Sequence, residues 1–294
     1  MKGNAAVGFL VLVLCSCRSP MRSGGRWNAG TYKCATDVRF NLVARSYLLH
    51  VPANAPEGKW PLVVVVHGAF NTARRMEEQT GFSSLADEKG FCVAYPNGIG
   101  IFGLLQHWNA GHCCGKAAKD DVNDVGYLDA VIEDVSACCP VDPGKVFIVG
   151  HSNGGMLVYR YVGERSERIA GAAVVAGAIN STADKQRRSW RPVRPKRPVP
   201  IMILHGTEDP AVPLEGGESP TKKDGRLYAP VSDAEDFWLS ANGGAAPVRV
   251  ELLEGWGHNW PGPLFTEEAG VPEALRGYDA AGVIWDFFQA ISSD

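Results

Sequence analysis

A serine between glycines lies near the middle of the chain. The pentapeptide 150–154 reads Gly-His-Ser-Asn-Gly, follows an apolar run at 145–149 and opens a segment with helical spacing. A serine on a sharp turn between a strand and a helix presents its hydroxyl above the sheet, and the glycines avoid a collision across that turn. The pattern therefore predicts that Ser152 acts as a nucleophile.

A serine hydroxyl needs a base within hydrogen-bond distance, and two later strand ends supply candidates for it. The apolar run 201–204 leads to Asp209, and the run 248–253 leads to His258. The carboxyl ends of parallel strands meet at one edge of a sheet, and the order serine, acid, histidine suits this kind of turn. We expect His258 to be the general base and Asp209 to orient it. Glu208 is the nearest alternative acid, but Asp209 is favoured because a proline follows it and because of the family pattern given below.

Backbone amides are expected to stabilise the negative charge that such a reaction creates. The amide of Asn153 lies at the start of the expected helix, where amide groups point toward an anion. The amide of Ala69, or less favourably that of Phe70, follows the apolar run 62–66 and His67-Gly68. This chemistry requires no metal ion and no organic cofactor.

The other histidines are not expected to take part in the reaction. His67 and His205 each close a buried strand, where a neutral imidazole usually satisfies backbone groups. The remaining four fill a variable position of the pentapeptide or lack a strand-end setting in the required order, namely His151, His50, His107 and His112.

Short apolar runs alternate with longer amphipathic segments, which is typical of a mostly parallel sheet with helices on both faces. The expected strands are 46–51, 62–66, 91–95, 145–149, 171–175, 201–204 and 248–253. The expected helices are 81–89, 125–137, 154–163, 232–242 and 278–291, and Asp124 stands where an N-cap belongs. The fold class predicted is α/β, in a single domain over 36–294.

The amino terminus has the composition of a targeting segment. Lys2 precedes an apolar run over 5–14, which is shorter than the roughly twenty residues that a membrane-spanning helix needs. Residues 1–17 are therefore expected to be a signal peptide, with 18–35 as a tether. The residues before Cys17 resemble a bacterial lipobox, so Cys17 is a candidate lipidation site, and plain secretion is the alternative. In both cases the protein is exported, to the cell envelope or the medium.

Cysteine content agrees with export, because disulfides persist in oxidising compartments. Six cysteines lie beyond the targeting segment, and the sequence leaves their pairing open: Cys34, Cys92, Cys113, Cys114, Cys138 and Cys139. Their spacing does not favour a zinc site. A net charge of −3 gives no general attraction to nucleic acid. The basic, proline-rich segment 187–200 is expected to be an extended surface loop, with a polyanion-binding patch as the alternative, and the protein is expected to be a monomer.

Several sequence blocks together resemble one family. They are His67-Gly68, Trp108-Asn109-Ala110-Gly111 with Cys113-Cys114, Asn123-Asp124-Val125-Gly126-Tyr127, the stretch 150–156, the stretch 205–213 with Glu215-Gly216-Gly217, and the stretch 257–262. From about Tyr47 onward, the chain resembles exported esterases of the polyhydroxybutyrate depolymerase and feruloyl esterase group, which are related to carbohydrate esterase family 1 within the α/β-hydrolases. The resemblance implies the same three residues, Ser152, Asp209 and His258. Segment 187–200 and Trp256 depart from the family pattern.

The resemblance implies that the partner of the site is an ester, hydrolysed through an acyl-enzyme. Candidate substrates are feruloyl or acetyl esters of plant polysaccharides and short polyhydroxyalkanoates. Phe70, Trp108 and Trp260 are candidates for an aromatic wall that contacts the substrate. Two alternatives are an exported peptidase of the prolyl-oligopeptidase kind, which usually carries an appended domain, and a non-catalytic binding protein on the same fold.

Overall fold

The computed structural model describes residues 28–101, 103–183, 190–222, 225–266 and 271–292. Its centre is an eight-stranded sheet in the order β1-β2-β4-β3-β7-β8-β10-β13. The pairs β1–β2 and β2–β4 are antiparallel, and all the other neighbouring pairs are parallel. The strands of this sheet are β1 (Gly30–Phe40), β2 (Val43–Val51), β3 (Trp60–Val66), β4 (Cys92–Pro96), β7 (Val141–His151), β8 (Gly171–Val175), β10 (Ile201–Gly206) and β13 (Val248–Leu253). The predicted fold class, a mostly parallel α/β sheet, is confirmed.

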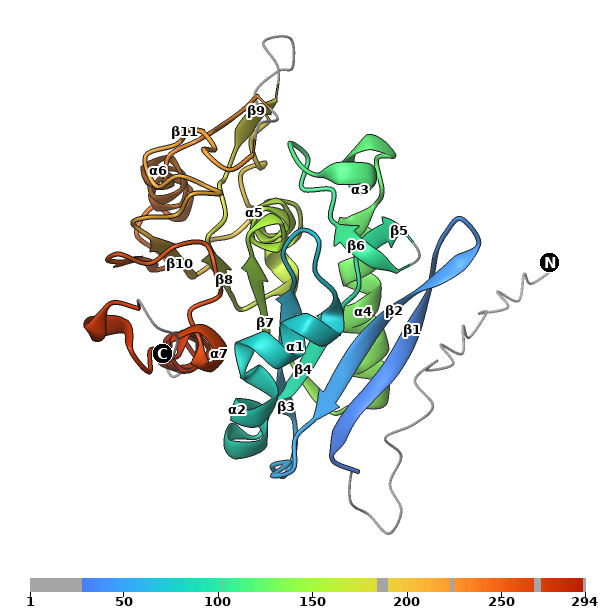
Figure 1. Cartoon of the computed structure of the whole chain (residues 1–294). Coiled ribbons are helices and arrows are strands. Elements are labelled where there is room, and N and C mark those ends of the chain that lie inside the picture. The colour runs from blue at the N-terminus through green and yellow to red at the C-terminus, as the bar shows by residue number, and fades with distance from the viewer. Residues whose placement is uncertain (1–27, 102, 184–189, 223–224, 267–270, 293–294) are drawn as a thin grey trace, which may run out of the picture.

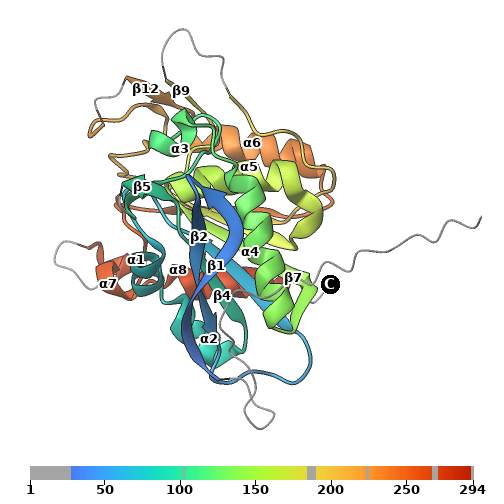
Figure 2. The same ribbon diagram turned by 90° about the vertical axis from the view of Figure 1, so that its right-hand side faces the viewer.

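Helices cover both faces of the sheet. The helices among the described residues are α1 (Ala73–Thr80), α2 (Phe82–Lys89), α3 (Gly115–Lys119), α4 (Asp124–Cys138), α5 (Asn153–Arg165), α6 (Val231–Asn242), α7 (Pro263–Thr266) and α8 (Ala280–Ala290), with short 3₁₀ turns at Ser166–Arg168 and Glu273–Leu275. Figure 1 shows the sheet twisting through the molecule beneath a group of loops and small strands. Figure 2 looks at the β1 edge and shows α4 and α1 on opposite sides of the sheet.

The alternation of side chains along β3 explains why both faces are covered. Leu62, Val64 and Val66 pack with α4, α5 and α6 in one hydrophobic cluster, whereas Val63 and Val65 pack with α1, α2 and α8 in another. All five side chains are fully buried. A continuous apolar run is what a strand buried on both faces requires, because successive side chains point to opposite faces.

Short strands and loops gather beyond the ends of the central strands. They form a three-stranded sheet from β9 (Ser181–Ala183), β11 (Gly217–Glu218) and β12 (Arg226–Tyr228), and a hairpin from β5 (Ile99–Ile101) and β6 (Leu104–His107). Residues 190–200 contain no helix or strand, in agreement with the extended connection expected there.

The structure differs from the sequence expectations in several details, three of which bear on the sheet and the site. β1 begins at Gly30 and pairs with β2, so the last part of the segment expected to be a tether belongs to the sheet. α1 was not expected, because an eight-residue helix carries too few repeats for its period to stand out. The N-cap of α4 is Asn123, whose side chain accepts the amide of Gly126 at 2.9 Å, whereas Asp124 is the first helical residue and turns inward.

Candidate active site

Ser152 lies on a sharp turn between β7 and α5. Its backbone is held at φ +52° and ψ −120°, a conformation that residues other than glycine rarely adopt. A Cβ added at Gly150 would lie 2.4 Å from the carbonyl oxygen of Gly154, and one added at Gly154 would lie 2.3 Å from that of Val66. The turn therefore exists only because both flanking positions lack a side chain, as the pentapeptide predicts.

The structure brings together the three side chains that lie far apart in sequence. Ser152 Oγ lies 2.8 Å from Nε2 of His258, and Nδ1 of His258 lies 2.7 Å from Oδ2 of Asp209. Asp209 follows β10 and His258 follows β13, and these parallel strands end in register, with Gly206 opposite Leu253. The common edge of the sheet thus places acid, imidazole and hydroxyl in one hydrogen-bonded line.

The surroundings of Asp209 keep its carboxyl group ionised. The amides of Ala211 and Val212 donate to Oδ1 at 2.8 and 2.9 Å, which leaves Oδ2 for His258. Burial acts to raise the pKa of Asp209, but the hydrogen bond from His258 and the charge on that ring outweigh it, so the pKa lies below its usual value. The alternative acid, Glu208, has an exposed side chain.

The ring of His151 holds the loop that carries His258, a contact that the sequence analysis did not anticipate. Its Nε2 lies 2.8 Å from the backbone oxygen of His258, and the two rings are 5.3 Å apart. Burial lowers the pKa of His151 to about 3, so the ring is neutral at ordinary pH and donates one N–H. In the sequence, the one indication of this role was that a histidine, which can donate a hydrogen bond from its ring, directly precedes Ser152.

The two buried strand-end histidines have the structural roles expected of them. Nε2 of His205 lies 2.8 Å from the carbonyl oxygen of Val212, and Nδ1 of His67 lies 2.7 Å from that of Gly68. Burial lowers the pKa of His67 to about 4 and lowers that of His205 as well. Both rings are therefore neutral, and their role is to hold nearby backbone in place by hydrogen bonds.

The amides of Asn153 and Ala69, which the sequence analysis expects to stabilise the negative charge, both belong to segments next to Ser152. Asn153 is the first residue of α5, and the first amides of a helix lack an acceptor within it. Ala69 follows β3, whose Val66 pairs with Gly150 of β7, so the loop after β3 lies against the turn at Ser152. The amide of Phe70 is already engaged, because it donates to the carbonyl oxygen of Gln106 at 2.8 Å.

The prediction that three aromatic side chains contact the substrate is wrong for two of them. The side chain of Phe70 is 59% exposed, but Trp108 is 0% and Trp260 1% exposed, so neither indole presents a surface to a ligand. The Nε1 group of Trp108 donates to the carbonyl oxygen of His67 at 2.8 Å. The Trp260 ring packs against Phe82. Both tryptophans support the loops of the site from beneath.

The side chain of Asn153 fixes the backbone of Trp108. Its Oδ1 accepts the amide of Trp108 at 2.8 Å, and its Nδ2 donates to the carbonyl oxygen of the same residue at 3.2 Å. Two hydrogen bonds to one residue set both the position and the orientation of the side chain. The loop containing Trp108 is consequently locked to the start of α5.

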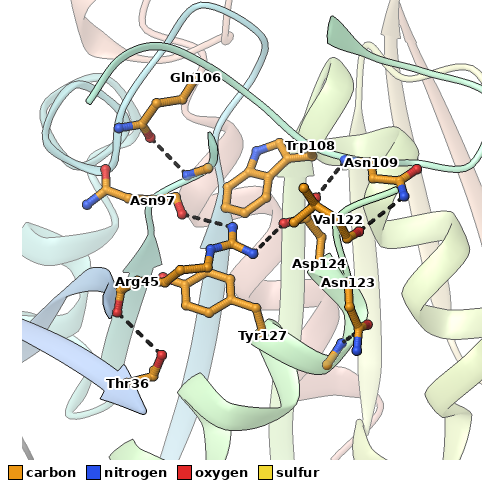
Figure 3. A network of polar contacts seen from close by, with 12 residues as sticks. Thr36, Arg45, Asn97, Gln106, Trp108, Asn109, Val122, Asn123, Asp124 and Tyr127 are labelled. Carbon is orange, nitrogen blue, oxygen red and sulfur yellow. Dashed lines mark hydrogen bonds and ion pairs between the residues drawn. The ribbon is translucent and has the colours of Figure 1, made fainter. Parts of the chain in front are cut away.

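A buried ion pair anchors the same loop from the other side (Figure 3). Nη1 of Arg45 lies 2.6 Å from Oδ1 of Asp124, with side chains 3% and 0% exposed. The other oxygen of Asp124 accepts the amide of Asn109 at 2.7 Å, and the guanidinium lies 3.6 Å from the centre of the Tyr127 ring. Burial raises the pKa of Asp124, and the charge of Arg45 opposes this. The sequence block 123–127, which is part of the family resemblance, therefore has a structural role: it holds the loop that contains Trp108 and Asn109.

The side chains of the neighbouring residues Cys113 and Cys114 lie against each other just before α3. Within the described ranges, no group of three or more histidine, cysteine, aspartate or glutamate side chains is arranged to hold a metal ion. No helix among those residues is both long and apolar enough to cross a membrane. Cys17, expected to be a lipidation site, lies outside the part of the chain that the structure describes.

The strand order, the positive-φ serine turn and the site at the carboxyl edge together define an α/β-hydrolase. Residues 45–212 match the family described as esterase PHB depolymerase, and the chain belongs to this family. A solved ferulic acid esterase of the CE1 family from Anaeromyces mucronatus has a TM-score of 0.57 at 16% identity, covering 82% of this chain and 89% of that one. A poly(3-hydroxybutyrate) depolymerase from Bordetella parapertussis has a TM-score of 0.54 at 18% identity, covering 79% and 84%. At these identities the two structures bear on the fold alone.

Two curated relatives are more similar in sequence. A putative esterase, NocK, from Nocardia uniformis subsp. tsuyamanensis is 33% identical over 175 residues, which is 58% of this chain and 47% of that protein. Feruloyl esterase B from Piromyces equi is 31% identical over 162 residues, which is 54% of this chain and 28% of that protein. The matched part of the chain thus spans less than half the length of either relative.

We expect the buried ion pair to be essential for stability. Replacing Asp124 with alanine leaves the Arg45 guanidinium buried without a counter-charge, and should lower the free energy of unfolding by about 3–5 kcal/mol. Urea denaturation measures this loss. The double variant Arg45→Met/Asp124→Leu should lose less than Asp124→Ala alone. As a control, Arg74→Ala breaks an ion pair whose arginine side chain is 68% exposed, and should cost less than about 1 kcal/mol.

Buried histidines should make the fold sensitive to mild acid. Burial lowers the pKa of His67 to about 4 and those of His112 and His151 to about 3. In the unfolded chain each ring takes up a proton near pH 6.5, so the unfolded state binds more protons below that pH and stability falls as the pH falls. Protonation of each ring in the unfolded chain should lower the free energy of unfolding by roughly 2 kcal/mol between pH 7 and pH 5. Urea denaturation at pH 7, 6 and 5 measures the slope, which should become smaller in His112→Phe. An unfolding free energy that stays constant over this range contradicts the prediction.

Proposed function

We propose that this protein is a serine carboxylic-ester hydrolase. The observation that carries the proposal is the line of hydrogen bonds from Ser152 through His258 to Asp209, at 2.8 and 2.7 Å. Distances in this range permit proton transfer from a nucleophile to a base and orientation of that base by an acid. Membership of a family described as esterase, and relatives named as esterases, support the reaction class.

The proposed reaction begins when Ser152 Oγ attacks the ester carbonyl carbon and His258 takes the hydroxyl proton at Nε2. The negatively charged oxygen is then held by the amides of Asn153 and Ala69. As the intermediate collapses, the bond to the alcohol oxygen breaks, and His258 returns its proton to that oxygen. Asp209 stays ionised and stabilises the positive imidazolium throughout. Water then attacks the acyl-serine by the same steps, which releases the acid and restores the serine.

The proposed substrates are feruloyl or acetyl esters of plant polysaccharides, or short polyhydroxyalkanoates. Feruloyl esterase B supports the first class. A poly(3-hydroxyalkanoate) depolymerase C from Paucimonas lemoignei, 26% identical over 251 residues, supports the second. The exposed ring of Phe70, beside the amide of Ala69, is the proposed contact for the acyl group. It packs edge-on against His107 with ring centres 4.5 Å apart, which fixes its orientation.

We also propose that the protein is exported, as a lipoprotein anchored at Cys17 or as a freely secreted enzyme, with one catalytic domain. The basic residue followed by an apolar run at 5–14 supports export. A run of that length suits a cleaved signal better than a membrane span, for which roughly twenty residues are needed.

Removal of the hydroxyl should abolish turnover while leaving the fold intact. Ser152→Ala should lower kcat on p-nitrophenyl butyrate by about 10³-fold or more, because it removes the oxygen that attacks the ester carbonyl. Circular dichroism and the urea midpoint of the variant verify that folding is unchanged. If the alanine variant keeps most of the activity, the assignment of Ser152 as the nucleophile is wrong.

His151 should act as a positioning residue for His258. Replacing it with alanine removes the donor that holds the His258 backbone oxygen, and should lower kcat by about 10-fold to 100-fold with a smaller change in KM. His151→Gln, which keeps an N–H donor on the side chain, should recover part of the loss. Equal activity of the wild type and both variants on p-nitrophenyl butyrate would exclude this role.

A further inference from the structure

The indole of Trp108 lies between the two segments that carry the proposed oxyanion donors, Asn153 and Ala69. The side chain of Trp108 is fully buried, so it presents no surface to a substrate. It is hydrogen-bonded on both sides, through its ring to the loop that precedes Ala69 and through its backbone to the side chain of Asn153. A residue that joins these two segments can influence the reaction without touching the ester.

The loop after β3 lies directly against the nucleophile and against the start of α5. A Cβ built on Gly68 would lie 3.3 Å from the Cβ of Ser152. A Cβ built on Gly154 would lie 2.5 Å from the carbonyl oxygen of His67. The loop and the helix therefore approach each other closely, and glycine in both segments permits this. The carbonyl oxygen of His67 lies at their point of contact.

Two hydrogen bonds fix successive peptide units of this loop. Nε1 of Trp108 donates to the carbonyl oxygen of His67 at 2.8 Å, which holds the unit between His67 and Gly68. Nδ1 of His67 lies 2.7 Å from the carbonyl oxygen of Gly68, which holds the next unit. The carbonyl and N–H groups of one trans peptide point in opposite directions, so the second bond also sets the direction of the Ala69 amide. Together the two bonds remove the rotational freedom that a glycine at position 68 would otherwise have.

The backbone of Trp108 is fixed in turn to the other proposed donor. The side chain of Asn153 accepts the Trp108 amide at 2.8 Å and donates to the Trp108 carbonyl oxygen at 3.2 Å. The amide of the next residue, Asn109, donates to Asp124, which pairs with Arg45. Figure 3 shows the Trp108 indole near this ion pair, and the guanidinium carbon lies 5.6 Å from the centre of the Trp108 ring. Trp108 therefore cannot shift without breaking contacts on both of its sides.

We propose that Trp108 is a positioning residue for the oxyanion hole, which holds the amide of Ala69 in a fixed place relative to the amide of Asn153. The inference rests on the proposed esterase function and deepens it, because it names the group that keeps the two donors in place. Donors that are fixed in advance stabilise developing charge better than donors that must reorganise during the reaction. Trp108 acts through the two amides rather than by contact with the ester.

The first test removes the indole N–H. Trp108→Phe keeps an aromatic ring but leaves the carbonyl oxygen of His67 without its donor, so the Ala69 amide gains freedom to move. On p-nitrophenyl butyrate, kcat should fall by about 10- to 50-fold while KM changes by less than about twofold, because stabilisation of the transition state is lost and binding of the substrate is kept. A kcat within about twofold of the wild type overturns the proposal.

Trp238→Phe is the matched control. The Trp238 side chain, on α6, is also fully buried, and its Nε1 has no hydrogen-bond partner among the described residues. The same truncation there removes no hydrogen bond, so kcat should stay within about twofold of the wild type. A loss equal to that of Trp108→Phe means that truncation of any buried tryptophan lowers activity, and overturns the proposal.

The second test separates positioning of the donors from a general loss of structure. Ser152 Oγ adds to the carbonyl carbon of propyl trifluoromethyl ketone and its proton passes to His258, so the carbonyl oxygen becomes a charged oxygen like the oxyanion. The Ki of this compound should rise in Trp108→Phe by about the factor by which kcat/KM falls. The Ki of butyramide, an uncharged competitor, should change by less than about twofold. Equal changes for the two inhibitors overturn the proposal.

Asn153→Ala tests the same connection from its other end, and decides the question if Trp108→Phe does not fold. This change keeps the backbone amide and removes both bonds to Trp108, so kcat should again fall by about tenfold or more, and an unchanged kcat overturns the proposal. In the double variant the two losses should not add, because both changes break one connection. If the wild type does not cleave p-nitrophenyl butyrate, the esterase function itself fails, whereas full activity of both single variants rejects the role of Trp108 alone.

Discussion

The positive-φ turn at Ser152 is the constraint on which the rest of the site depends. Such a backbone is strained for serine, and it persists because the surroundings determine it from several sides. The Ser152 amide donates to the carbonyl oxygen of Val175 at 2.8 Å, and its carbonyl oxygen accepts the amide of Met156 at 2.9 Å. The first bond ties the turn to β8 and the second starts α5. The geometry of the hydroxyl is therefore set by the sheet and the helix together rather than by the turn alone.

Most of the architecture could be predicted from the sequence, because the parallel strands are continuous apolar runs. β8 and β13 have the bounds expected for them, whereas β3 begins two residues earlier and β10 ends two residues later than expected. Asp209 and His258 could be placed at one edge because strand ends in a parallel sheet share that edge. β1 was missed since it is an edge strand whose side chains are mostly not buried, so it has no apolar run to reveal it.

What could not be predicted depends on long-range contacts. Trp108 and Trp260 resemble surface aromatics in sequence because each lies in a glycine-rich loop, yet both are buried. Asp124 resembled a helix cap because it precedes an amphipathic segment, but its partner Arg45 is in β2, far away in the chain. The hydrogen bond between the His151 ring and the His258 backbone oxygen joins residues that are 107 positions apart. Local patterns carry no record of such pairs.

The burial of the two tryptophans also changes how specificity must arise in the proposed enzyme. An aromatic wall would have bound feruloyl rings and polyester chains alike, since both present apolar surface. With Trp108 and Trp260 beneath the loops, the exposed ring of Phe70 is the member of that set left to contact an acyl group. A single ring gives limited discrimination, because apolar contacts differ little between ligands of similar shape. Hydrogen bonds to a hydroxylated alcohol part discriminate far more strongly, since a site left with unpaired buried groups rejects a ligand that lacks them.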